Sequence, residues 1–141
     1  MKPQPSHILA ELIAQHDGLR TMMDRCDELA DDLDVRDGDP ANLIREIAKL
    51  RIAFDAHNKF EEALLRPVLL AEDPFGPIRV DRMVEDHLHE HAAMRARLAS
   101  PATIGLRDVI ETLRAHLDAE ERYLLTAKVL RDDTVTIEGA G

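Results

Sequence analysis

A histidine followed by acidic residues four and five positions later occurs twice in this chain of 141 residues. The first copy spans residues 57–62 and the second spans residues 116–121, and an alanine precedes the histidine in both. Residues four apart on an α-helix lie on one face, a single turn from each other. The repeat therefore predicts two helices that each present a histidine and a carboxylate to the same neighbour.

The spacing of apolar residues predicts a helical protein throughout, because these residues recur at steps of three and four and no long stretch alternates at period two. Breaks rich in Pro, Gly and Asp separate the periodic segments. The predicted helices span residues 6–33, 41–72, 78–99 and 104–130, and residues 131–141 fit no helical period. Pro67 is expected to disturb the second helix near its end. Short connections between four helices predict an all-α, up-down-up-down antiparallel four-helix bundle, as one domain over residues 1–141.

Composition excludes several classes of function. The net charge is −10, which argues against nucleic acid or an anionic membrane as the main partner. No apolar stretch has the length of a signal peptide core or a membrane span, so the cytoplasm is the expected compartment. Cys26 is the only cysteine, which excludes an internal disulfide and a cysteine-based zinc site. It falls on the apolar face of the first helix and is expected to be buried.

Further polar side chains fall on the predicted apolar faces. His16 lies within the apolar stripe of the first helix, and His87 and His91 are four residues apart on the third. Counted from the breaks, His16 lies roughly 17 residues before the first helix ends and His57 roughly 16 after the second begins, which places them at similar heights. The same count places the histidines and carboxylates of the other helices at similar heights, to within about one helical turn. The inward-facing set is predicted to be His16, His57, Glu61, His87, His91, His116 and one of Glu120 or Glu121.

Two histidines fall outside this set. His89 is two residues from its inward-facing neighbours, which turns it about 160° to 200° away from them, towards solvent. His7 is nine residues from His16 and so lies about 180° round the helix. Both are predicted to be surface residues.

Buried imidazole and carboxylate groups without partners are costly, and a metal centre would satisfy all of them together. Nitrogen and oxygen donors without thiolate suit iron, manganese or zinc. Seven ligands exceed the needs of one tetrahedral zinc ion but suit two six-coordinate ions that share carboxylates and an oxo or hydroxo bridge. The Glu-x-x-His pairs of ferritin-like di-iron sites and the His-Glu-x-x-His motif of zincins are both missing.

These motifs, taken in order over residues 8–130, resemble those of the hemerythrin family. The resemblance implies two bridged iron ions, five histidine ligands and Glu61 as a bridging carboxylate. The second bridge is left open at this point. The repeat of the His57–Glu61 spacing favours Glu120, whereas the oxygen-carrying members place an Asp at i+5, which favours Glu121.

The resemblance implies a non-haem di-iron protein that binds dioxygen for storage, delivery or sensing. The alternative within the same family is a di-iron stress enzyme that handles peroxide or nitric oxide, or donates iron for repair. The resemblance does not decide whether the chain is an enzyme or a binding protein, and it allows an oligomer because carriers of this family often assemble. A third reading, a helical interaction bundle without metal, requires every buried polar group to find another partner.

Overall fold

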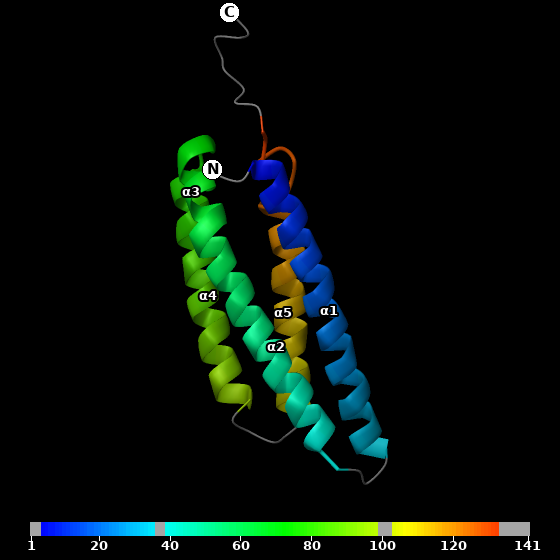
Figure 1. Ribbon diagram of the computed structural model, residues 1–141. Helices are drawn as coiled ribbons and strands as arrows, with labels where there is room; N and C mark the ends of the chain where they lie inside the picture. Colours follow the sequence, from blue (N-terminus) through cyan, green and yellow to red (C-terminus); the bar gives the residue numbers. More distant parts are fainter. Residues whose placement is uncertain (1–3, 36–38, 99–102, 133–141) are drawn as a thin grey trace, which may run out of the picture.

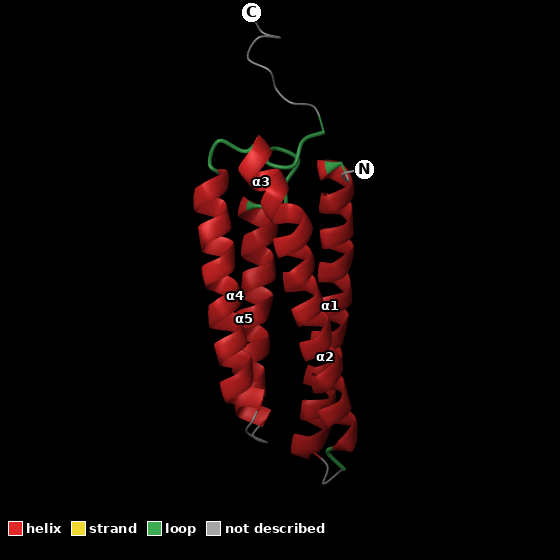
Figure 2. Ribbon diagram, turned by 60° about the vertical axis from the view of Figure 1, so that its left-hand side comes forward, coloured by secondary structure: helices red, strands yellow, loops and turns green. Residues whose placement is uncertain are grey.

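The computed structural model describes residues 4–35, 39–98 and 103–132, and all regular structure within these ranges is helical. The elements are α1 (Pro5–Val35), α2 (Ala41–Phe60), the π-helical turn η1 (Glu61–Leu65), α3 (Arg66–Glu72), α4 (Gly76–Leu98) and α5 (Thr103–Tyr123). Because α2, η1 and α3 follow one another without a break, they act as one long helix. The chain thus forms the predicted antiparallel four-helix bundle, in which α1 packs against α2 and α5, and α4 packs against α3 and α5 (Figures 1 and 2).

The last helix is shorter than predicted. It ends at Tyr123 instead of continuing to residue 130, and the amides of Leu124 and Leu125 both donate to the Glu120 carbonyl, at 2.8 and 2.7 Å. The chain then turns back over the end of the bundle, where Leu124, Leu125 and Leu130 are buried. The burial of these three leucines offsets the loss of the helical hydrogen bonds that a longer α5 would have made. The irregular tail was predicted for residues 131–141: residues 131 and 132 are not helical, and residues 133–141 lie outside the described residues.

The disturbance expected near Pro67 takes the form of the wide turn η1. Proline has no amide hydrogen, so it cannot donate to the carbonyl four residues earlier. Immediately before it, the amide of Arg66 donates to the carbonyl of Glu61, five residues back. Such single π-turns within α-helices occur mainly at functional sites. Here the wide turn begins at Glu61, the carboxylate of the first sequence repeat.

The core consists of two apolar clusters separated along the bundle axis. One lies towards the loop between α1 and α2 and includes Met23, Phe54 and Leu113. The other lies at the end of the bundle that carries α3 and includes Leu12 and Leu69. Between them, each long helix contributes buried histidine or glutamate, so a polar layer crosses an otherwise apolar interior. None of the described helices is long and apolar enough to cross a lipid bilayer.

A series of ion pairs joins α1 to α5 along their length. In order along α1, the pairs are Arg20 with Asp118 and Glu121, Arg114 with Asp24 and Asp27, and Arg107 with Asp31 and Asp34. Each pair is partly exposed and contributes little by itself, but charges of fixed spacing on both helices favour one register over others. That register brings His16 opposite Glu120.

Candidate metal centre

Glu120 of α5 lies at the centre of the polar layer and meets histidines from three helices. Its Oε1 is 3.0 Å from the Nε2 of His16 on α1 and 3.5 Å from the Nε2 of His57 on α2. Its Oε2 is 3.2 Å from the Nε2 of His116, one turn earlier on α5. The two oxygens of one carboxylate therefore face different imidazole rings.

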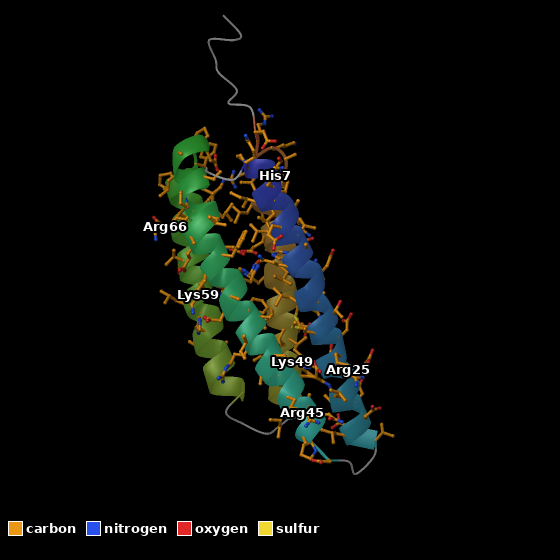
Figure 3. The ribbon with its side chains drawn as sticks, in the orientation of Figure 1. His7, Arg25, Arg45, Lys49, Lys59 and Arg66 are labelled. Atoms are coloured by element: carbon orange, nitrogen blue, oxygen red, sulfur yellow. The ribbon has the colours of Figure 1, made fainter. Side chains whose placement is uncertain are left out.

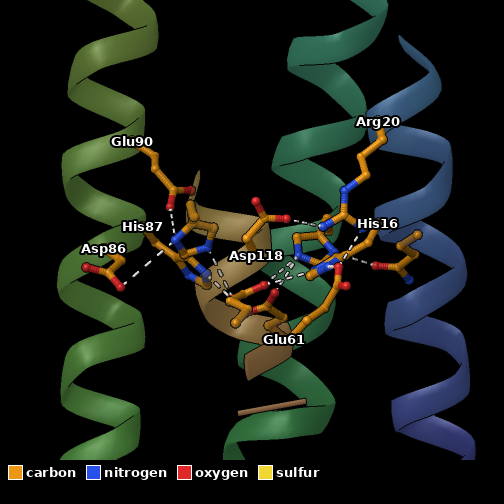
Figure 4. Close-up of polar contacts among 12 residues, drawn as sticks. His16, Arg20, Glu61, Asp86, His87, Glu90 and Asp118 are labelled. Carbon is orange, nitrogen blue, oxygen red and sulfur yellow. Dashed lines mark hydrogen bonds and ion pairs between the residues drawn. The ribbon is translucent and has the colours of Figure 1, made fainter. Parts of the chain in front are cut away.

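Glu61 makes a matching set of contacts from the opposite side of the bundle. Its Oε1 pairs with the Nε2 of His57, one turn earlier in the same long helix. Its Oε2 is 3.3 Å from the Nε2 of His87 on α4. Figure 4 shows Glu61 between His16 and His87, with contacts running to both sides. Like Glu120, Glu61 thus connects histidines on two sides of the layer.

The outer nitrogen of each of these four rings, Nδ1, faces an oxygen at the edge of the layer. The pairs are His16 with Glu121 (2.7 Å), His57 with Gln15 (2.8 Å), His87 with Glu62 (3.1 Å) and His116 with Glu90 (2.7 Å). Carboxylate and amide oxygens only accept, so Nδ1–H donates to them. A hydrogen bond of this kind fixes the orientation of a metal-binding histidine and leaves Nε2 as the ligand atom.

Burial and charge oppose each other at the histidines. Burial of His57 disfavours the imidazolium, but the adjacent carboxylates of Glu120 and Glu61 outweigh the effect of burial and raise the pKa of His57 to about 9. Burial of His116 is outweighed in the same way by Glu120 and Glu90, and its pKa rises to about 10. In the absence of metal, both rings are protonated at pH 7.

The two central carboxyl groups respond in opposite directions. Burial and the neighbouring charge of Glu120 raise the pKa of Glu61. Burial acts in the same direction on Glu120, but its close contacts with three histidines outweigh burial and hold its pKa well below the usual range. Glu120 is therefore the permanent anion at the centre of the layer.

The donor set fits metal ions. Several buried atoms make no well-formed hydrogen bond to any described residue, among them His57 Nε2, His116 Nε2, Glu61 Oε1 and Glu120 Oε2. The possible ligand atoms form two groups, and within each group all atoms lie within 4.8 Å of one another. One group consists of His16, His57, Glu61 and Glu120, and the other consists of His87, His116 and Glu120. Because both groups contain Glu120, the residues present can hold two neighbouring cations with a shared carboxylate.

Comparison with known proteins agrees with this reading of the site. The sequence model of the hemerythrin HHE cation-binding domain matches residues 7–127. The chain belongs to the hemerythrin family. No curated protein and no solved structure matches it. The buried His/Glu layer of this hemerythrin domain supplies the donor atoms for the cation binding that the family description states.

The structure does not bring His91 into the cluster. Its side chain is 49% exposed, and its Nε2 lies 3.2 Å from Asp55 on α2. The buried positions of α4 continue from Met83 and His87 to Glu90, in steps of four and three. His91, one residue further round the helix, falls outside that stripe. The inward position predicted for His91 is occupied by Glu90 instead.

The structure distinguishes the two candidate carboxylates on α5. Glu120 is 6% exposed and faces Nε2 atoms, whereas Glu121 is 30% exposed and accepts from His16 Nδ1 at the outer side of the ring. The repeat of the i+4 spacing therefore pointed to the central residue. The two histidines predicted to be surface residues, His7 and His89, are exposed, and His7 lies at the N-terminal end of α1 (Figure 3).

Gln15 and Glu90 contribute to the layer but were not predicted from the sequence. Glu90 could have been found, because it continues the three- and four-residue steps of Val80, Met83 and His87. Gln15 carried no comparable signal. It flanks His16 at the edge of the apolar face of α1, and only the packing of α1 on α2 brings its amide oxygen to His57.

Substitution of His87 and of His91 in turn should show which histidine of α4 binds metal. The His87→Ala protein should bind one metal ion per chain where the unmodified protein binds two, because the second group of ligands keeps only His116 and shared carboxylates. The matched His91→Ala protein should still bind two. Metal content after gel filtration, measured by elemental analysis, tests this. Loss of a metal ion from the His91→Ala protein alone would show that the outward His91 is the ligand.

Metal uptake should release protons at pH 7. A metal binds neutral imidazole, whereas the pKa values of about 9 for His57 and about 10 for His116 keep both rings protonated in the metal-free protein. The apparent affinity should therefore rise from pH 6 towards pH 9, by up to about tenfold per unit for each proton displaced. Titration calorimetry in buffers of different ionisation enthalpy measures the protons released. An affinity that stays flat over this range would contradict protonated rings.

Proposed function

We propose that this hemerythrin domain holds two iron ions in its His/Glu layer and binds dioxygen reversibly, for storage, delivery or sensing. The observation that carries the proposal is the convergence of four Nε2 atoms on two carboxylates that each face both sides of the layer. Nitrogen and oxygen donors suit iron. The only thiol, Cys26, lies in the apolar core, where burial raises its pKa to about 11, so it does not compete for the metal.

The chain contributes a partly open side to the layer. His16, His57 and Glu61 are at most 2% exposed, while His116 and Glu120 also line a cavity of about 510 Å³ between α4 and α5. Part of the wall of this cavity is apolar, from Ile78, Met83 and Leu124. An apolar diatomic molecule can enter such a cavity without losing hydrogen bonds to water. His116 and Glu120 would hold a ferrous ion next to this cavity, and such an ion would supply the electrons that dioxygen binding requires.

One observation favours a second function, the decomposition of peroxide. Glu90 is buried and lies 2.7 Å from the Nδ1 of His116, so a carboxyl and an imidazole that can exchange a proton adjoin the open side. Peroxide cleavage consumes protons, whereas reversible dioxygen binding is favoured where proton donors are kept from the ligand. In peroxide decomposition the His116–Glu90 pair would deliver protons to the ligand, whereas in reversible dioxygen binding it would not.

An absorption spectrum of the iron-loaded protein, reduced without oxygen and then exposed to air, tests the proposal. Reversible binding predicts a visible band that appears in air and disappears on degassing, through repeated cycles. Rapid, irreversible loss of that band would move the assignment to peroxide or nitric oxide chemistry. An absence of any iron-dependent absorption would contradict iron as the metal.

A further inference from the structure

The groove between α4 and α5 joins the protein surface to the open side of the polar layer. A cavity of about 660 Å³ lies in this groove, and its lining includes Glu85, Asp86, Glu90 and His116. The neighbouring cavity of about 510 Å³ shares Asp86 and His116 with it and reaches Glu120. Of the described residues, only His116 among the four central histidines lines either cavity.

The carboxylates of α4 become progressively more buried along this groove. The exposed fraction falls from 69% at Glu85 to 40% at Asp86, and Glu90 is 5% exposed. Asp86 and Glu90 are one turn apart and approach the same ring atom, His116 Nδ1, at 4.0 and 2.7 Å. Figure 4 shows Glu90 reaching from α4 towards the centre, and Asp86 beside α4 with a dashed line to the ring. A row of oxygen atoms therefore leads from solvent to the layer.

Glu90 has an oxygen that the fold leaves without a partner. Its Oε1 contacts His116, but its Oε2 is buried and makes no hydrogen bond to any described residue. A buried carboxylate oxygen is costly unless a donor or a cation meets it. Because Glu90 also lines the larger cavity, a cation inside that cavity can reach this oxygen.

On the α1–α2 side of the layer, the described residues cover the two histidines. His16 and His57 are at most 2% exposed, and their outer nitrogens face Glu121 and Gln15. The Arg20 guanidinium covers Glu121, which it meets at 2.6 Å. A cation approaching there would meet a positive charge before it met a ligand.

We propose that the α4–α5 groove is the route by which divalent cations enter the polar layer, with Asp86 and Glu90 as successive transient ligands. The inference rests on the proposed metal centre and adds the path by which it is filled. Carboxylates along a groove raise the local concentration of cations and hence the rate of association. Arg82, 80% exposed and 3.9 Å from Asp86, opposes entry by competing for the same carboxylate.

The rate of cobalt(II) uptake by the metal-free protein, followed by stopped-flow absorption, tests the route. The Asp86→Asn protein should take up cobalt roughly three- to tenfold more slowly at low ionic strength, with unchanged final stoichiometry, and the difference should shrink as salt increases. Asp81→Asn is the matched control, since Asp81 is an exposed acid of α4 that lines neither cavity. It should load within about twofold of the unmodified protein, since its charge acts from outside the groove.

Two further variants act on the groove in opposite directions. Arg82→Ala removes the competing cation and should accelerate uptake, while Ala119→Phe places bulk in both cavities and should slow it. Equal rates for the Asp86→Asn and Asp81→Asn proteins would overturn the route, as would a loss of stoichiometry in Asp86→Asn, which would make Asp86 a permanent ligand. An unmodified protein that takes up no cobalt would instead overturn the metal centre itself.

Discussion

The contact of four imidazole rings with two buried carboxylates is the interaction on which the rest of this bundle depends. Glu61 and Glu120 lie at 0% and 6% exposure, in a layer where water is largely excluded. Charges in such a place are tolerated only when they are paired and hydrogen-bonded. Each of the four helical segments must therefore place its ligand at one height, and the apolar clusters above and below the layer hold them there.

The hydrogen-bond acceptors at the edge of the layer determine how the four histidine rings are oriented. Acceptors at the Nδ1 atoms of His16, His57, His87 and His116 turn all four Nε2 atoms inward. Arg20 in turn holds Glu121 beside His16, which links the layer to the ion pairs between α1 and α5. The same features that fix the register of the helices thus orient the ligand atoms. Among the residues that the structure describes, two cavities adjoin the cluster on the α4–α5 side, next to His116.

The bundle and most of the candidate site were predictable from the sequence, because both follow from helical periodicity. The repeated His-x-x-x-Glu spacing brought Glu61 and Glu120 to the histidine face, and heights counted from the loops matched His16 to His57. His91 was wrongly predicted to face inward, because the spacing of residues on one helix does not show which of its faces packs against the neighbouring helices. The wide turn at Glu61 and the early end of α5 at Tyr123 depend on hydrogen bonds and leucine burial that only the packed structure reveals.

The most direct test of the central claim is anomalous diffraction from crystals of the iron-loaded protein, measured on both sides of the iron absorption edge. Two iron peaks should lie between the carboxylates of Glu61 and Glu120, one next to His16 and His57 and the other next to His87 and His116. A single peak, or iron bound at the surface between Asp55 and His91 instead, would contradict a shared two-metal centre.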